Sequence, residues 1–400
     1  MTLPPPLGSQ TADDLRTAEG QVEGQVEGQV EGRIAYLLSA QAVRDRCRQI
    51  FNLCEADKLE HFTCDLAQLD RVAEYVVETT QQSYPDFEVP FHSRWRHFDA
   101  GDTDRLTPLY QALGDNQAKA LLDLVIISVL LDAGAGTQWR YHDPLTDQGL
   151  GRSEGLAVAS LRAFEQGVFS SDPQWPYQVD AIALQSLTES DLAQAFQVSE
   201  TNPLVGLSGR LSLLHQLGQT LATNPDRFGQ NPPRPGNLLD FWQDRYGNTM
   251  DAGVLLSEVL ASLGAIWPGR VAIAHTNLGD VWPHPALADD PLGANLVPFH
   301  KLSQWLTYSL VEPLTAAGLS VTHLNALTGL AEYRNGGLCV DLGLLVPKHP
   351  QVTRESHVPS SPVVVEWRAL TVVMLDLIGD RVCQLLQKTP DELPLIKVLE

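Results

Sequence analysis

Apolar residues along much of this 400-residue chain recur at the three- and four-residue spacing of amphipathic helices. In the first helical stretch, which begins at Arg33, Ile34, Leu37 and Leu38 share one face, and Val43 extends it. The same spacing predicts helices within residues 33–43, 69–77, 155–167, 204–221 and 253–263. Each of these helices is expected to bury its apolar face.

Two further segments need more than periodicity. Residues 121–136 are almost entirely apolar, which fits a buried strand or a buried helix, and their length favours the helix. Residues 179–196 hold two short periodic pieces, and Thr188 is suited to cap the second. Strand patterns are short, at residues 271–274, 339–346 and 363–365. The predicted fold class is therefore mainly α, with a few short strands.

Two stretches interrupt the helical pattern. Residues 1–32 contain a proline run and three tandem GQVE copies between residues 20 and 31. Glycine costs roughly 1 kcal/mol at each helical position, so we expect this segment to be a disordered tail without a catalytic role. Residues 224–237 form a proline-rich connection. We expect residues 33–400 to be a single helical domain, and any division into two lobes to fall at 224–237.

Composition narrows the possible partners. A hydrophobic content of 44% supports a large core, and the formal charge of -22 disfavours nucleic acids and anionic membranes. The five cysteines include no CxxC pair, which is typical of reduced thiols. The chain has no signal-peptide pattern and no run of eighteen apolar residues. We therefore expect a soluble cytoplasmic protein that binds a small molecule, with an oligomeric state that the sequence leaves open.

Two clusters near the C-terminal end combine acids with arginines in apolar flanks. Glu332, Tyr333 and Arg334 stand side by side, and Glu366 and Arg368 follow about thirty residues later. Burying such charges costs several kcal/mol unless they are paired. One interpretation is a site in which two carboxylates in unequal environments divide a hydrolysis. The other is a structural ion-pair network, and the residues alone leave the two interpretations equal.

Residues 275–301 gather His275, Asp280, His284, His300 and Lys301 among prolines. Carboxylate and imidazole groups are able to bind a metal or to transfer a proton near neutral pH. For each histidine taken alone, a rigid loop whose polar groups bond its own backbone is the favoured interpretation. No HxH or HExxH pattern accompanies them, so a metal site is the minority interpretation.

A basic and aromatic segment, PFHSRWRHFD, contains Arg94 and Arg96 on either side of a tryptophan. Arginine offers a bidentate fork to phosphate or carboxylate groups, although the same pair also fits the neutralisation of nearby acids. Trp139 could form another wall of such a pocket, or belong to the core. Patterns for dinucleotides, P-loops and GxSxG nucleophiles are absent.

Long motifs resemble the uracil catabolism protein 4 family. They are PFHSRWRHF, LLDAGAGTQWRY, GRSEGLA, NPLVGLSGR, IWPGR, LGDVWPHP, FHKLSQWLTYSLVEPL, LTGLAEYRNGG, SPVVVEWRALTVVMLD and LPLIKVLE. The resemblance covers residues 35–400, and the GQVE tail is the main departure. The order of elements is also similar to the queuosine 5′-phosphate N-glycosylase family, whose members are mostly helical and similar in fold to DNA glycosylases.

The resemblance implies a reaction. In the more distant family an acid-Tyr-Arg motif and a later Glu-x-Arg motif correspond to Glu332-Tyr333-Arg334 and to Glu366 and Arg368 here. That family has aspartate where this chain has Glu332, which shifts the carboxylate by one methylene. The pathway of the closer family implies cleavage of an N-ribosyl bond in a phosphorylated ribosyl-urea or a ring-opened uridine nucleotide, with release of urea or a urea derivative.

The expected roles follow from that reaction. Glu332 would stabilise oxocarbenium charge and orient water, and Glu366 or Asp280 would protonate the leaving group. The expected substrate-binding residues are Arg94, Arg96, Asp132, Trp139, His284, His300, Lys301, Tyr333, Arg334 and Arg368, and the chemistry requires no cofactor. One alternative is a metal-dependent hydrolase that opens or deaminates the ring through Asp280, His284 and His300. Another is a non-catalytic partner that binds a pathway metabolite.

Overall fold

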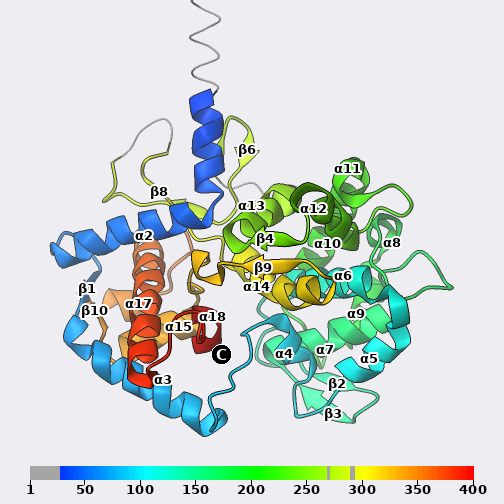
Figure 1. The fold of residues 1–400 in the computed structure, drawn as a ribbon, viewed down its shortest axis with the longest axis horizontal. Helices are drawn as coiled ribbons and strands as arrows, with labels where there is room; N and C mark the ends of the chain where they lie inside the picture. The colour runs from blue at the N-terminus through cyan, green and yellow to red at the C-terminus, as the bar shows by residue number, and fades with distance from the viewer. Residues whose placement is uncertain (1–27, 268–270, 289–292) are drawn as a thin grey trace, which may run out of the picture.

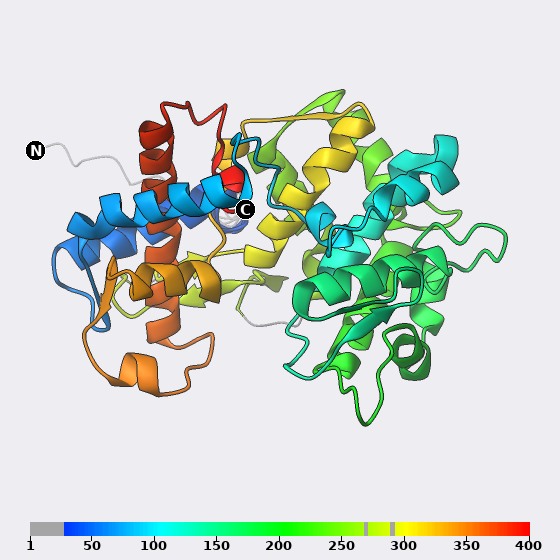
Figure 2. The same cartoon turned by 90° about the horizontal axis from the view of Figure 1, so that it is seen from below.

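Helices make up most of the fold, and the strands form only two-stranded pairings (Figure 1). The computed structural model describes residues 28–267, 271–288 and 293–400. Apolar side chains in these segments form two large buried clusters and a smaller third one. Two lobes result, which lie side by side in Figures 1 and 2.

The terminal lobe joins the two ends of the described chain around one long helix, α17. Its elements are α2 (Ala40–Glu55), β1 (Phe62–Cys64), η1 (Leu66–Gln68), α3 (Leu69–Ser83), β7 (Val281–Pro283), β8 (Leu296–Pro298), α15 (Tyr333–Asp341), β10 (Leu345–Pro347), α16 (Gln351–Arg354), α17 (Pro362–Leu386) and α18 (Leu395–Val398). Helices α2 and α3 pack against α17, and β1 pairs antiparallel with β10. Figure 1 shows α17 in red beside the two blue helices.

The central lobe is built from the intervening chain around α6. Its elements are α4 (Arg94–Phe98), α5 (Leu106–Leu113), η2 (Gly114–Asn116), α6 (Gln117–Leu130), β2 (Tyr141–Asp143), β3 (Gln148–Leu150), α7 (Arg152–Glu165), α8 (Ala181–Ser186), α9 (Glu189–Ala195), α10 (Leu207–Thr223), α11 (Pro225–Phe228), η3 (Pro235–Asn237), α12 (Leu238–Tyr246), β4 (Thr249–Asp251), α13 (Ala252–Leu263), η4 (Gly264–Ile266), α14 (Lys301–Ala316), β9 (Ser320–Thr322) and η5 (Leu324–Ala326). Every residue of α6 from 120 to 130 is buried, because neighbouring helices cover it on all sides.

Helix α14 borders both lobes. It packs along α6, and the hydroxyl of its Ser309 accepts a hydrogen bond from the backbone N–H of Arg94 at 3.0 Å. On the other side, the hydroxyl of Tyr308 donates to the carbonyl of Thr328 at 3.1 Å. The loop after residue 327, which leads to Glu332, is thereby fixed against α14. The helix therefore positions groups from both lobes.

Several predicted elements are confirmed. The segment at 121–136 is mostly helix, as α6, and Thr188 caps α9 through a reciprocal capping box with Asp191. Helices α7, α10 and α13 lie within or close to the ranges predicted from periodicity. The short strand expected at 271–274 is β5 (Ala272–Ile273), which pairs with β6 (Thr276–Asn277). The mainly helical fold class is confirmed.

The strand expected at residues 363–365 is wrong, because these residues form the first turn of α17. Three consecutive valines favour a strand locally, but Pro362 occupies the first helical turn, and Val365 is buried in a helix that packs against α2, α3 and α15. At 339–346 the expectation is half right, since α15 continues to Asp341 and β10 begins only at Leu345. Tertiary packing overrides a weak local preference in both segments.

Residues 224–237 do not separate the lobes. Phe228 is fully buried in the central cluster, and Asp123 of α6 accepts hydrogen bonds from Arg234 and from the backbone N–H of Gly236. The segment is therefore part of the central lobe. The lobes meet instead where α14 and the loop after residue 327 contact each other.

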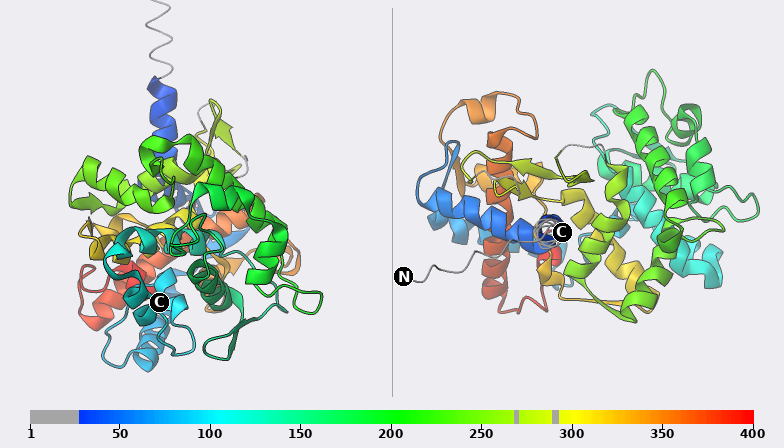
Figure 3. Two further views of the ribbon diagram at one scale, coloured as in Figure 1. Left: turned by 90° about the vertical axis from the view of Figure 1, so that its right-hand side faces the viewer. Right: turned by 90° about the horizontal axis from the view of Figure 1, so that it is seen from above.

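The predicted tail lies mostly outside the described residues, but its last part does not follow the prediction. Residues 28–37 are helical, so the final GQVE copy continues into the helix that carries Leu37. Leu37 is buried against Leu278, Val281 and Leu296, and this contact anchors the C-terminal end of the helix. Figure 3 shows the helix projecting from the body of the molecule.

Candidate active site

A cavity of about 270 Å³ opens at the N-terminus of α14. It is lined by Leu260, Trp267, Gly279, Asp280, His300, Lys301, Leu302, Ser303 and Arg368. Four of the residues singled out in the sequence, Asp280, His300, Lys301 and Arg368, therefore come together here. They come from three separate stretches of the chain, which only the fold brings to one place.

Asp280 and Arg368 form a bidentate ion pair in the wall of this cavity. The two guanidinium nitrogens Nη1 and Nη2 lie 2.8 and 2.7 Å from the two carboxylate oxygens. Asp280 also accepts from Trp282 Nε1 at 2.7 Å and from the backbone N–H of Lys301 at 3.1 Å. Burial opposes ionisation, but Arg368 and these donors together hold the pKa of Asp280 well below its usual range. Asp280 is therefore an ionised group at neutral pH.

His300 and Lys301 form the rim of the cavity at the start of α14. His300 has a left-handed backbone, with φ of 47°, and its Nε2 lies 2.7 Å from the carbonyl of Leu37. That carbonyl requires the proton to be on Nε2, and burial lowers the pKa of His300, so the ring is neutral. Because the charges of Asp280 and Arg368 cancel each other, the Lys301 ammonium gives the cavity an excess positive charge.

Glu332 is connected to this cavity through the backbone. Arg368 Nε donates to the carbonyl of Ala331 at 3.2 Å, so the guanidinium that binds Asp280 also holds the residue before Glu332. Glu332 is the N-cap of α15, and its Oε1 accepts from the N–H of Asn335 at 2.9 Å. A carboxylate is favourable at this end of a helix. Its second oxygen makes no hydrogen bond to the described residues.

Tyr333 and Arg334 extend outward from the same turn. Tyr333 is exposed, and its hydroxyl accepts a 3.2 Å hydrogen bond from Arg334 Nε. The hydrogen bond to Tyr333 raises the pKa of Arg334 and burial lowers it, and the nearby charges of Tyr333, Glu332 and Glu154 raise it further. Since Glu154 belongs to α7, Arg334 faces the central lobe. It therefore brings positive charge to the space between the lobes.

Glu366 points away from that space. It is fully buried, and its Oε1 accepts hydrogen bonds from the backbone N–H groups of His61 and Phe62 at 3.0 and 2.8 Å. Its Oε2 lies 3.7 Å from Nε2 of the buried His284. Two residues along a helix correspond to about 200° of rotation, so Glu366 and Arg368 project from opposite sides of α17. Glu366 thus anchors the chain at β1.

Asp280, His284 and His300 do not form a common ligand set. Asp280 binds Arg368, His284 faces Glu366, and His300 binds a backbone carbonyl. No group of three or more histidine, cysteine, aspartate or glutamate side chains suited to hold a metal ion occurs among the described residues.

A second polar cluster lies in the central lobe, on the side of α14 that Trp305 covers. Arg94 is fully buried, and its Nη1 lies 3.0 Å from Asp132 Oδ2, 3.1 Å from Ser153 Oγ and 3.2 Å from His97 Nδ1. Ser153 Oγ donates to the Asp132 carboxylate, at 2.7 Å from each oxygen. Burial raises the pKa of Asp132, but Arg94 and the Ser153 hydroxyl lower it more, with smaller contributions from His97 and Lys301. The influence of Lys301 places the two polar clusters near each other.

Two residues of the expected set lie elsewhere. Trp139 is fully buried, and its Nε1 donates to the carbonyl of Phe196 at 2.9 Å, so it belongs to the core of the central lobe. Arg96 donates to Glu312 of α14 at 2.7 Å on the partly exposed side of α4. Neither side chain faces Asp132 or Asp280.

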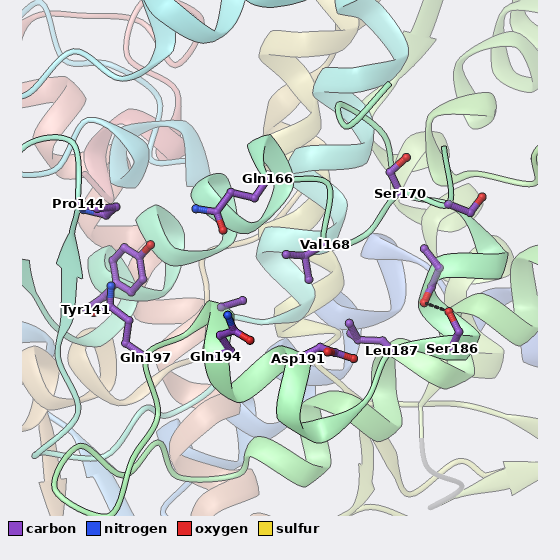
Figure 4. A pocket seen from close by; sticks show the side chains of 13 residues that line it. Tyr141, Pro144, Gln166, Val168, Ser170, Ser186, Leu187, Asp191, Gln194 and Gln197 are labelled. Atoms are coloured by element: carbon purple, nitrogen blue, oxygen red, sulfur yellow. Dashed lines mark hydrogen bonds between the residues drawn. The ribbon is translucent and has the colours of Figure 1, made fainter. Parts of the chain in front are cut away.

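A larger cavity, of about 660 Å³, lies in the central lobe (Figure 4). It is lined mainly by uncharged polar side chains such as Gln166 and Gln194. Several of its polar groups already have partners, since Gln197 binds both backbone groups of His142 and Asp191 caps α9. This cavity has no paired charges comparable to those near α14, so size alone does not identify the site.

Two residues of this region, Ser153 and Trp305, were not singled out in the sequence, whereas His97 belongs to the basic and aromatic segment PFHSRWRHFD. His97 and Ser153 contact Arg94, and Trp305 lies against His97 with ring centroids 5.7 Å apart. Each occurs within a long motif, namely PFHSRWRHF, GRSEGLA or FHKLSQWLTYSLVEPL. Membership in those motifs was the available signal, because a serine between an arginine and a glutamate, or a tryptophan within a buried helix, does not by itself indicate a site.

Comparisons with known proteins identify the family of this chain. The chain is 41% identical over 354 residues to Protein urg3 of Schizosaccharomyces pombe, and this match covers 86% of this chain and 84% of the relative. It is 35% identical over 383 residues to Uracil catabolism protein 4 of Lachancea kluyveri, and this match covers 86% of this chain and 87% of the relative. Among the described residues, no helix has the length and apolar character needed to span a membrane. The model of a family described as protein of unknown function (DUF1688) matches residues 36–400, and the chain belongs to that family.

Proposed function

We propose that this chain acts in uracil catabolism by hydrolysing the N-glycosidic bond of a ribosyl-urea-like compound whose natural form is the 5′-phosphate. The pathway is inferred from the name of one relative, Uracil catabolism protein 4. The reaction is taken from the similarity of Glu332-Tyr333-Arg334 to the acid-Tyr-Arg motif of a glycosylase family.

The observation that carries the proposal is the charged cavity at α14. Asp280 and Arg368 neutralise each other, which leaves Lys301 as the excess charge beside the first turn of the helix. Free backbone N–H groups at a helix N-terminus and a nearby ammonium group are suited to a phosphate. At about 270 Å³ the cavity has the size of a small polar ligand, close to the lower limit of typical ligand sites.

Glu332 is the carboxylate best suited to stabilise positive charge on the sugar. It is half-buried, and only one of its two oxygens is used by the cap of α15. The free oxygen is available to orient a water molecule toward C1′, while the negative charge lowers the energy of the oxocarbenium-like transition state. Arg368 fixes the backbone that carries Glu332 and makes its position depend on the integrity of the cavity.

The leaving group also needs a proton, and the two acids named from the sequence are poorly suited to supply it. Asp280 is held ionised by Arg368, and Glu366 is engaged with the backbone of β1. We therefore assign Asp280 to organising Arg368 and the start of α14, and Glu366 to the stability of the terminal lobe. The proton has to come from another donor, such as a bound water molecule.

The test is incubation of the purified protein with synthetic N-ribosylurea and its 5′-phosphate, with assay of released urea. Glu332→Gln should lower kcat by about 100-fold or more while KM changes little, because the charge acts mainly in the transition state. Glu355→Gln, at an exposed position after α16, is the matched control and should keep full activity.

Three results would contradict the proposal. One is the absence of urea release from either compound, which would favour a non-catalytic binding role. Another is undiminished turnover by Glu332→Gln. The third is activity that is lost on chelation and restored by a stoichiometric metal ion, which would support the metal-dependent hydrolase instead.

A further inference from the structure

The second polar cluster contains a histidine whose proton position is fixed by its surroundings. Arg94 Nη1 lies 3.2 Å from His97 Nδ1, and a guanidinium group has only hydrogen-bond donors. Nδ1 must therefore accept, which leaves the single proton of the neutral ring on Nε2. Burial and the charge of Arg94 lower the pKa of His97 to about 3, which agrees with a neutral ring. His97 therefore presents a permanent N–H donor.

Asp132 presents the complementary acceptor. Its carboxylate accepts a hydrogen bond from Ser153 and forms an ion pair with Arg94, and a carboxylate has about four acceptor positions. The side chain is 15% exposed, so the unused positions are open to a ligand. Both His97 Nδ1 and Asp132 Oδ2 bind the same Arg94 nitrogen. One buried guanidinium group therefore holds the His97 ring and the Asp132 carboxylate close together.

Trp305 forms an apolar wall beside this pair. Its ring centroid is 5.7 Å from that of His97 and 4.7 Å from that of His92. Its Nε1 is buried and finds no acceptor within the described part of the chain. Trp305 lies one helical turn after Lys301, about 6 Å along α14, and therefore on the same face of that helix.

We infer that Asp132 and His97 form a binding site for the N–H and C=O edge of a ureido or primary amide group. Asp132 accepts the N–H, His97 Nε2 donates to the carbonyl oxygen, and Trp305 covers the planar face. The inference rests on the proposed function, because a ureido group is the leaving group of that reaction. It deepens the proposed function by naming the residues that select this group.

Two probes isolate this edge. The first is the carbocyclic analogue of N-ribosylurea 5′-phosphate, in which a methylene replaces the ring oxygen so that no oxocarbenium ion forms. The second is the same compound with two methyl groups on the terminal nitrogen, which removes its N–H donors and keeps the carbonyl. Wild-type protein should bind the first probe at least about 10-fold more tightly, the range expected of a hydrogen bond to a charged group.

The variants should then respond differently, as measured by isothermal titration calorimetry. Asp132→Asn should reduce the preference to less than about 3-fold by weakening only the unmethylated probe. His97→Phe keeps a ring against Trp305 but lacks the donor, so both probes should weaken together. Asp147→Asn, whose side chain is 95% exposed on the loop between β2 and β3, is the matched control and should bind like wild type.

Equal binding of both probes by wild type, or a full preference in Asp132→Asn, would overturn the inference. If Asp132→Asn fails to fold because Arg94 loses its counter-charge, His97→Phe remains decisive, since unchanged affinity for both probes would also overturn it. Urea release by wild type from N-ribosylurea 5′-phosphate reports separately on the proposed hydrolysis. A probe preference that depends on Asp132 without urea release would remove the hydrolysis and leave the ureido site standing.

Discussion

The ion pair between Asp280 and Arg368 should be a major source of stability for the region that joins the lobes. Asp280→Asn keeps the shape of the side chain and removes its charge, so Arg368 is left with an uncompensated charge. The carboxylate accepts four hydrogen bonds, two from Arg368, one from Trp282 and one from the backbone of Lys301. The amide nitrogen of asparagine is unable to accept any of them.

The size of the effect follows from burial. Removal of one partner from a buried ion pair costs about 3–5 kcal/mol. The two side chains are 24% and 15% exposed, so partial solvation reduces this to about 2–3 kcal/mol. That corresponds to a decrease of about 30- to 150-fold in the ratio of folded to unfolded protein.

Guanidinium chloride denaturation of wild type and Asp280→Asn at pH 7 measures this difference. Asp147→Asn, at a highly exposed carboxylate, should stay within about 0.5 kcal/mol of wild type. A loss smaller than about 1 kcal/mol in Asp280→Asn would refute the assignment of the pair as a strongly coupled one.

The pH dependence provides an independent check. The pKa of Asp280 is lower in the folded state than its unfolded value of about 3.9, so its contribution is fully present above that value and is lost as the pH falls toward the folded pKa. The stability difference between wild type and Asp280→Asn should be constant from pH 7 to pH 5 and should narrow below about pH 4. A difference that widens on acidification would refute this reasoning.

Two other predictions concern packing. Gly336→Ala would place a Cβ 2.7 Å from the Trp367 indole and should lower the unfolding free energy by about 1–3 kcal/mol. A Cβ added at Gly337 would meet no atom within 4 Å, so Gly337→Ala should be neutral or stabilising by up to about 1 kcal/mol. Thermal denaturation of the two variants measures the difference. Equal effects of the two substitutions would contradict the close packing of α15 on α17. Trp139→Phe removes the hydrogen bond to Phe196 and should lower the unfolding free energy by about 1–3 kcal/mol without changing KM for N-ribosylurea 5′-phosphate. A raised KM at unchanged stability would show instead that this tryptophan contacts the substrate.

The helical fold class was accessible from the sequence because periodicity is a local property. Residues 121–136 and the cap at Thr188 were predicted from their own neighbourhoods, and the structure confirms both. The strand at 363–365 was wrong for the complementary reason. Consecutive valines resemble a strand locally, whereas in the fold they begin α17, which packs against three other helices.

The sequence also singled out the charged residues that the cavity gathers. Asp280, His300, Lys301 and Arg368 were all singled out as polar or ionisable side chains, and they line one space. Glu366 is also a charged residue in an apolar stretch, but it accepts hydrogen bonds from the backbone of His61 and Phe62, on the side of α17 opposite to Arg368. Charge in an apolar setting predicts that a residue is paired or functional, but it does not predict its direction.

By itself, the sequence determined the helical class, the family and the set of polar residues that must be satisfied somewhere in a large core. These depend on composition, spacing and motif, which are properties of neighbouring residues. Only the tertiary structure decided which of those residues share a space, because Asp280 and Arg368 are 88 positions apart and meet across separate elements. It also decided that Arg94 fixes the proton of His97, since hydrogen-bond direction depends on atoms brought together by folding.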